Sequence, residues 1–322
     1  MTVAQWQGRK EGGGRFALWL IRSIGLTCGR GVARLILYPI TLYFFFRRGH
    51  ERRASRAFLT RALGRPAGVP DVLRHIHAFA SITLDRVFLL ARGMRGFDID
   101  IVGMEALERR LDGGRGVLLL GAHVGSFEVL RVLALKRPQV PLRVVLDKAQ
   151  TPVMTELLEA LAPDIGNNVI DASRGSTDVV LAMHEAAQRG AMVALLGDRG
   201  RAHEAMRRVP FFGEPAPFPA APWLIASTLQ LPVVLCFGLY LGGNRYRLMF
   251  EPYAEDTTIP RAGRDAALDA LIRGYAARLE AMVREHPYNW FNFYDFWHDP
   301  APDGGADPGR ADQPDLRGGH LA

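Results

Sequence analysis

Short apolar runs alternate with helix-like stretches through most of the chain, and this alternation is the strongest constraint on its fold. Each run is nearly continuous in Val, Leu and Ile, as expected for a strand buried on both faces of a sheet. The predicted strands are Phe97–Val102, Val117–Leu120, Leu142–Leu146, Asn168–Ile170, Met192–Leu196, Val233–Leu239 and Tyr246–Phe250. The predicted helices among them are Gly103–Leu111, Ser126–Lys136, Thr151–Leu161, Thr177–Arg189 and Ala220–Leu229, with a long one at Arg261–Glu285. This order predicts an α/β domain with a mainly parallel central sheet flanked by helices.

The length and composition fit one large domain with flanking segments. The chain has 322 residues, of which 48% are hydrophobic, enough to bury a sizeable core. We expect the α/β domain at 51–298, opening with helices over 51–92 that break at Gly64–Pro70. Residues 1–50 are the predicted membrane-anchoring segment. The tail at 299–322 is rich in Pro, Gly and Asp and is predicted to be disordered.

The N-terminal stretch is both apolar and basic. No acidic residue occurs from Phe16 to Phe46, and residues 1–60 hold eleven basic side chains but only two acidic ones. No uninterrupted apolar run reaches the roughly 20 residues that a membrane span requires. We therefore expect an amphipathic helix in the bilayer interface, with its arginines reaching the headgroups, and leave a single span open. The alternative is a soluble amphipathic helix packed on the domain. Arginines at 47–56 predict that the following chain is cytoplasmic.

Several classes of protein are excluded or disfavoured. Two cysteines, Cys28 and Cys236, exclude a disulfide scaffold and a cysteine-based zinc cage. The histidines lack metal-ligand spacing, so no metal and no cofactor is expected. From residue 61 onward the chain holds 29 basic and 31 acidic groups, which argues against a nucleic-acid partner.

The turn at 121–128 holds the residues that point most clearly to a catalytic function. A buried strand runs into Gly121, and His123 follows at the carboxyl end of that strand, where open α/β sheets bind ligands. Gly125 permits a sharp turn, Ser126 is a good helix cap, and Glu128 falls in the first helical turn. The imidazole and the carboxylate converge only if His123 precedes the helix. Such a pair accepts a proton from an attacking alcohol. The alternative is a turn histidine and a glutamate that complements the helix dipole.

This turn and four later segments resemble, in order, the lipid A biosynthesis acyltransferases, the late acyltransferases related to glycerolipid acyltransferases. The later segments are Arg189–Arg199, Val209–Ala216, Leu231–Leu235 and Tyr288–Trp297. The resemblance implies a glycerolipid acyltransferase-like fold. It also implies that a fatty acyl chain passes from acyl carrier protein or acyl-CoA to a hydroxyl of a lipid A-like or other membrane lipid. The implied location is the cytoplasmic side of the cell inner membrane.

The resemblance also assigns roles at the turn. His123 is the expected general base and Glu128 the carboxylate that orients it. Backbone N–H groups of the turn, with Arg199, are expected to stabilise the transition-state oxyanion. Asp198 and Arg199 end another strand, so both could reach the same edge of the sheet and are counted as substrate-binding candidates. Arg199 is equally a candidate for contacting a phosphate and for pairing with Asp198 or a helix end, and for Asp198 a structural role is expected rather than a catalytic one.

The stretch Gly197–Phe218 is expected to be a long loop that contacts substrate. Arg207 and Arg208 are predicted to meet the acceptor headgroup or the carrier's phosphopantetheine. Phe211 and Phe212 are predicted either to line an acyl channel or to belong to the core.

One segment, Leu146–Pro152, departs from the family pattern, so we expect a divergent branch with another lipid as acceptor. Two other functions stay open. A hydrolase of lipids or acyl thioesters would use water in place of the alcohol. A non-catalytic, membrane-docked protein would only bind acyl carriers.

Overall fold

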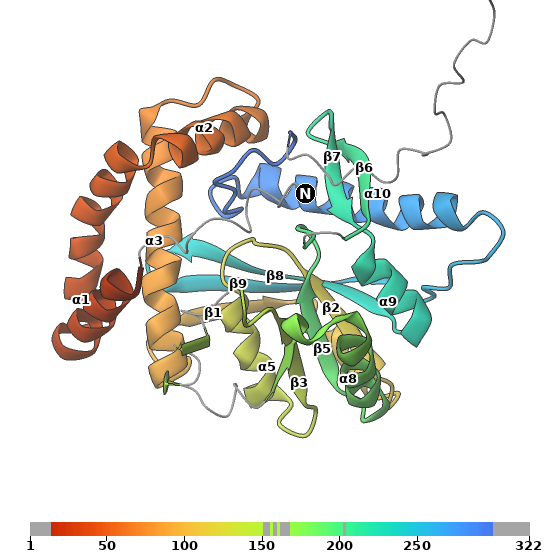
Figure 1. Ribbon diagram of the computed structural model, residues 1–322. Helices are drawn as coiled ribbons and strands as arrows, with labels where there is room; N and C mark the ends of the chain where they lie inside the picture. Colours follow the sequence, from red (N-terminus) through yellow and green to blue (C-terminus); the bar gives the residue numbers. More distant parts are fainter. Residues whose placement is uncertain (1–13, 151–154, 157–159, 162–167, 202–203, 299–322) are drawn as a thin grey trace, which may run out of the picture.

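The computed structural model describes residues 14–150, 155–156, 160–161, 168–201 and 204–298. Within them a seven-stranded sheet lies between helices (Figure 1). The predicted α/β class with a mainly parallel sheet is confirmed. Most of the predicted helix at Thr151–Leu161 and the whole predicted disordered tail lie outside the described residues. The predicted domain boundaries at residues 50 and 298 stay predictions.

The strands of the sheet run in the order β1-β9-β8-β2-β5-β3-β4. They are β1 (Asp98–Val102), β2 (Val117–Gly121), β3 (Leu142–Leu146), β4 (Val169–Asp171), β5 (Met192–Leu196), β8 (Val233–Gly242) and β9 (Arg245–Ala254). Every neighbouring pair is parallel except β8 and β9. Only Gly243 and Asn244 separate those two strands, too short a link for a helical crossover, so they form an antiparallel hairpin.

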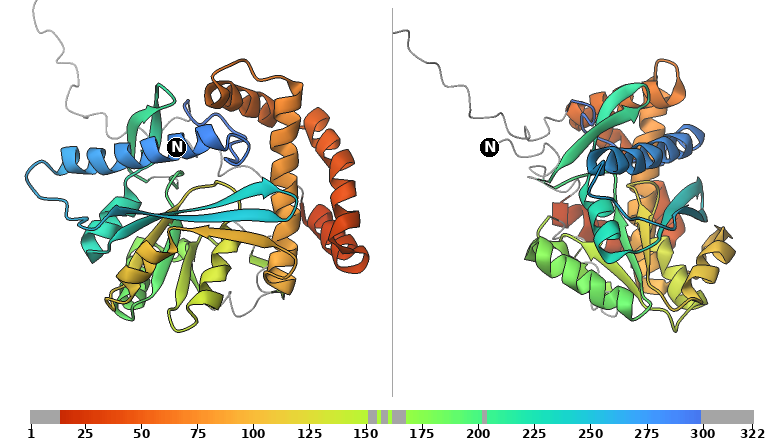
Figure 2. Two further views of the ribbon diagram at one scale, coloured as in Figure 1. Left: turned by 180° about the vertical axis from the view of Figure 1, so that it is seen from behind. Right: turned by 90° about the vertical axis from the view of Figure 1, so that its right-hand side faces the viewer.

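Helices cover both faces of the sheet. The helices of the described residues are α1 (Gly14–Arg47), α2 (Gly49–Leu63), α3 (Val69–Arg92), α4 (Met104–Leu111), α5 (Arg131–Lys136), α8 (Ser176–Gln188), α9 (Ala221–Leu229) and α10 (Arg264–Glu285), with short 3-10 turns η1 (Phe127–Leu130) and η2 (Ala172–Arg174). Alternate side chains of β2 divide the core. Leu118 and Leu120 pack with α8 and α10, whereas Val117 and Leu119 pack with α3 and α4. The sheet is therefore the middle of three layers (Figure 2).

The stretch predicted as a long loop at Gly197–Phe218 is largely a β-hairpin, so that prediction is wrong. Strands β6 (Met206–Phe211) and β7 (Glu214–Pro219) pair antiparallel beside α10 (Figure 1). Prolines that read as loop signals sit in this hairpin, because a two-stranded ribbon has outer edges where no N–H is needed. Phe212 and Gly213 both have positive φ at the tip.

Helix α1 lies against α3 on the flank of the domain (Figure 1). Its direction changes at Gly29, whose φ of 84° is non-helical. Ala33 and Leu37 face α3, while Leu35 and Phe46 are exposed. Across the residues described, none of the helices combines the length and the apolar character required to cross a bilayer. The predicted membrane helix stays a prediction.

A buried carboxylate fastens α1 to the domain. Asp85 of α3 is fully buried and accepts two hydrogen bonds from Arg30 of α1, at 2.7 and 2.8 Å. It also accepts one at 2.8 Å from the hydroxyl of Tyr246 in β9, and Arg34 lies 3.8 Å away. One anion thus joins α1, α3 and the sheet. Removing its charge leaves the partly buried guanidinium groups of Arg30 and Arg34 without their anion.

We therefore expect Asp85→Asn to lower the free energy of unfolding by about 3 kcal/mol. Chemical denaturation of the full chain measures this change. Asp100→Asn is the matched control, because Asp100 makes an exposed ion pair with Arg247, and it should cost less than about 1 kcal/mol. Equal losses in the two variants would contradict a fastening role for Asp85.

Candidate active site

The turn after β2 is built by close backbone approach. Gly125 has a φ of 63°, and a Cβ there would collide with the carbonyl oxygen of Gly238 in β8. A Cβ on Gly238 would in turn collide with the carbonyl of Ser126, whose N–H donates to Gly238 at 2.7 Å. Both positions therefore require glycine. This contact fixes the turn so that His123 stands at the carboxyl end of the sheet.

His123 is held by Asp198, which follows β5. The ring Nδ1 lies 2.8 Å from Asp198 Oδ1, and the His123 backbone N–H lies 3.1 Å from both carboxylate oxygens. The carboxylate is fully buried, whereas the imidazole side chain is 37% exposed. β2 and β5 are adjacent parallel strands, so their ends meet at the same edge. The ring is thus oriented from inside the protein and open on its outer side.

The protonation state follows from these contacts. Burial lowers the pKa of His123, the positive charge of Arg199 lowers it further, and Asp198 acts in the opposite direction. Burial would raise the pKa of the Asp198 carboxyl, but contacts with His123, Arg199 and Trp290 outweigh it and hold that pKa well below its usual range. At neutral pH the carboxylate therefore only accepts, and Nδ1 of a neutral ring must donate. Nε2 is left with a free lone pair, as a general base requires.

The prediction of a direct pair between His123 and Glu128 is corrected. The carboxylate of Glu128 forms an ion pair with Arg86 of α3 and accepts a hydrogen bond at 2.8 Å from the Ser126 hydroxyl. Because η1 starts at Phe127, Glu128 turns toward α3. Arg86 was missed by sequence reasoning, yet its charge also lowers the pKa of His123. No local pattern marks it, since it sits 37 positions earlier.

The predicted oxyanion site at the backbone of the turn stays a prediction. The N–H of His123 donates to Asp198, that of Val124 to Ala122, that of Gly125 to Asn289 and that of Ser126 to Gly238. The N–H groups of residues 123–126 therefore have acceptors within the protein.

Arg199 lies in the site but is largely enclosed. Its Nη2 donates to the carbonyl of Phe291 at 2.6 Å, its Nε lies 3.9 Å from Asp198, and it covers the ring of Tyr294. These contacts agree with the alternative role predicted for Arg199, which is pairing with Asp198. A role toward a phosphate or oxyanion stays a prediction.

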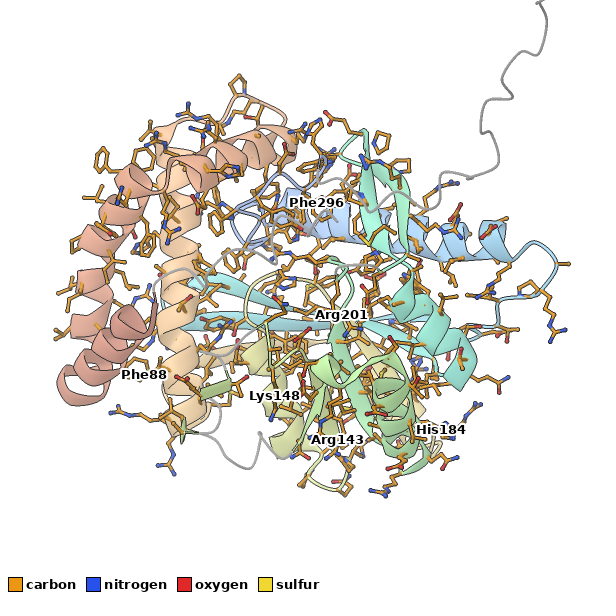
Figure 3. All side chains as sticks on the ribbon, viewed as in Figure 1. Phe88, Arg143, Lys148, His184, Arg201 and Phe296 are labelled. Atoms are coloured by element: carbon orange, nitrogen blue, oxygen red, sulfur yellow. The ribbon has the colours of Figure 1, made fainter. Side chains whose placement is uncertain are left out.

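The other predicted substrate contacts lie in and around the hairpin. Arg207 pairs with Asp265 and Asp269 of α10, and Arg208 donates to the carbonyl of Trp297 at 2.7 Å. The rings of Phe211 and Phe212 are buried in an aromatic cluster. Phe296, labelled in Figure 3, belongs to the same cluster. Core packing of the two phenylalanines is what the contacts show, and roles for these four residues in binding stay predictions.

A neutral imidazole backed by a carboxylate, at the carboxyl edge of a parallel sheet, is typical of an α/β enzyme that uses general-base catalysis. Such a base can take a proton from an attacking hydroxyl group or water. The sequence model of the bacterial lipid A biosynthesis acyltransferases matches residues 84–299, and the chain belongs to that family. The family resemblance of its motifs is confirmed.

A named relative agrees with a divergent branch. A phosphatidylinositol mannoside acyltransferase of Mycolicibacterium smegmatis is 22% identical over 249 residues, which cover 75% of this chain and 78% of the relative. Together with the family match, this makes the protein an acyltransferase.

A fully buried histidine, His75, lies next to the segment that supports the site. His75 of α3 bonds to the Trp290 carbonyl through Nε2 at 3.0 Å and to the Ser55 hydroxyl through Nδ1 at 2.8 Å. Its ring stacks on Phe291 and Phe293. Burial lowers the pKa of His75 to about 4, so this imidazole is neutral in the folded protein.

This burial predicts a specific loss of stability in acid. The unfolded chain binds a proton at His75 below pH 6.5, but the folded chain does so only near pH 4, so stability is full above pH 6.5 and falls between the two values. His75→Gln removes the titration. The difference in free energy of unfolding between wild type and this variant should shrink by about 2 kcal/mol between pH 7 and pH 4.5. Urea unfolding at the two pH values measures it. A constant gap would show that His75 does not titrate on unfolding.

Proposed function

We propose that the protein is a membrane-associated O-acyltransferase that moves a fatty acyl chain from a thioester donor to a hydroxyl group of a lipid. The observation that carries this proposal is the Nε2 lone pair of His123, directed by Asp198 at the edge of the sheet. The family match supports the reaction type, and the named relative supports a glycosylated inositol phospholipid as one acceptor class beside lipid A-like molecules.

In the proposed reaction His123 acts first as base and then as acid. Nε2 takes the proton of the acceptor hydroxyl as its oxygen bonds to the thioester carbonyl carbon. The tetrahedral oxyanion collapses, the C–S bond breaks, and the leaving thiolate takes the proton from the imidazolium. The products are the lipid ester and a free thiol on acyl carrier protein or CoA. In this proposal the guanidinium groups of Arg86 and Arg199, whose charges act on the imidazole, stabilise the oxyanion, and the N–H groups of residues 123–126 have other acceptors.

Membrane association in this proposal occurs through the outer side of α1 and α2. Leu35, Tyr38 and Phe46 are 67%, 61% and 73% exposed, an unusual exposure for large apolar side chains. Exposed arginines of α2, such as Arg53 and Arg56, follow directly in the chain. An apolar stripe beside basic residues suits the interface of an anionic bilayer, on the cytoplasmic side of the inner membrane.

The imidazole should be essential for transfer, and its carboxylate partner nearly so. Transfer from a radiolabelled acyl thioester to membrane lipids of a deletion strain should fall at least about 1,000-fold in His123→Ala and about 100-fold in Asp198→Asn. Acyl-CoA and acyl carrier protein are compared as donors. His184→Ala, which changes a half-buried histidine on α8, is the control and should keep full activity. Wild-type rates in a folded His123→Ala protein would refute the proposal, and acyl release without any lipid product would favour the hydrolase.

The exposed face of α1 should govern membrane binding. Leu35→Gln with Phe46→Gln should weaken binding to phosphatidylglycerol vesicles about tenfold or more, because about 25 cal/mol is lost per Å² of apolar surface no longer buried. Leu181→Gln, which removes a 56% exposed leucine from α8, should change nothing. Vesicle co-sedimentation measures both. Unchanged binding by the double variant would show that another surface docks.

A further inference from the structure

The segment 289–292, near the C-terminal end of the described chain, lies against the inner side of the turn that carries His123. Its Asn289 carbonyl accepts the Gly125 N–H at 2.8 Å, and its Phe291 N–H donates to the His123 carbonyl at 3.0 Å. These two bonds make Val124 and Trp290 an antiparallel bridge. Two backbone hydrogen bonds thus fix the turn from one side. The segment comes from a part of the chain far from β2, so it is a separate support for the site.

The side chain of Trp290 reaches the carboxylate behind His123. Its indole Nε1–H donates to Asp198 Oδ2 at 2.9 Å, while His123 bonds to the other oxygen, Oδ1. The indole is fully buried and is packed edge-on against Phe58, Phe211 and Phe296. A ring held so firmly keeps its N–H in one place, and the carboxylate plane is fixed with it.

We propose that Trp290 is a positioning residue of the active site, whose indole N–H holds the carboxylate of Asp198 in the orientation that directs His123. This inference rests on the proposed role of His123 as the base. Trp290 touches no reacting atom and acts through Asp198. A hydrogen bond to a charged carboxylate also withdraws part of its negative charge from the imidazole.

The charge environment gives the direction of the effect. The other charged or titratable groups that face His123 and Asp198 are Arg199, Arg86 and the phenol of Tyr275. Tyr275 is neutral, since burial raises the pKa of its hydroxyl, which donates to the Gly121 carbonyl. When the indole donor is lost, Asp198 attracts the His123 proton more strongly. The pKa of His123 should therefore rise by about half a unit.

The test measures that pKa in the full chain without any lipid. Diethylpyrocarbonate acylates only unprotonated imidazole, and mass spectrometry of the peptide that carries residue 123 gives the reaction rate against pH. Trp290→Phe should move the midpoint of this curve upward by about half a unit. Trp297→Phe is the matched control, because Trp297 is a buried tryptophan of the same cluster whose N–H donates instead to the Phe211 carbonyl. It should leave the midpoint where it is.

A second replacement separates the hydrogen bond from the packing. Benzothienylalanine at position 290 keeps the shape of the indole and replaces its N–H by sulfur, and it should give the same shift as phenylalanine. An unmoved midpoint with this residue overturns the inference, as does an equal shift in Trp297→Phe. Because the labelling needs no substrate, it reports on Trp290 even where transfer assays of His123→Ala fail to support the proposed reaction.

Discussion

A buried negative charge at the end of β5 is the constraint on which the site depends. Taking a carboxylate out of water is costly unless every lone pair finds a donor. Asp198 obtains its donors from the backbone and ring of His123 and from the indole of Trp290, with Arg199 at 3.9 Å. These groups come from three separate stretches of chain. Folding that leaves any one of them out exposes the charge to an apolar interior, so the catalytic geometry and the stability of the core have the same origin.

A second buried carboxylate, that of Asp85, has a similar structural role on the flank of the domain where α1 packs. Asp85 gathers Arg30 and Tyr246 and thereby brings α1 and β9 onto α3. The same helix supplies Arg86, whose neighbour in sequence is Asp85 but whose partner is Glu128 at the site. Helix α3 therefore links the exposed apolar face of α1 to the surroundings of His123. In the proposed function, docking of α1 on a bilayer sets the height of the site above the lipid headgroups.

The fold class and the position of His123 could be predicted from sequence, because buried parallel strands are near-continuous apolar runs and ligands gather at their carboxyl ends. The β8–β9 hairpin could also have been predicted from sequence, because the link at Gly242–Asn244 is too short for a helical crossover. The β6–β7 hairpin was harder, since its prolines are loop signals in most contexts. The hydrogen-bond partner of His123 could not be identified from local sequence patterns. Asp198 lies 75 residues away, and only the adjacency of β2 and β5 brings the two together.

The His-x4-Glu spacing still has a physical purpose, though a different one from direct pairing. Arg86 near the imidazole lowers the basicity of His123, and an unpaired guanidinium there would lower it further. Glu128 neutralises much of that charge, and the Ser126 hydroxyl holds Glu128 in place. In the proposed reaction, a glutamate in this position lets the charge of Arg86 assist at the oxyanion without removing the proton affinity of His123. On this argument the two carboxylates divide the work: Asp198 orients the imidazole, and Glu128 sets how much positive charge the imidazole experiences.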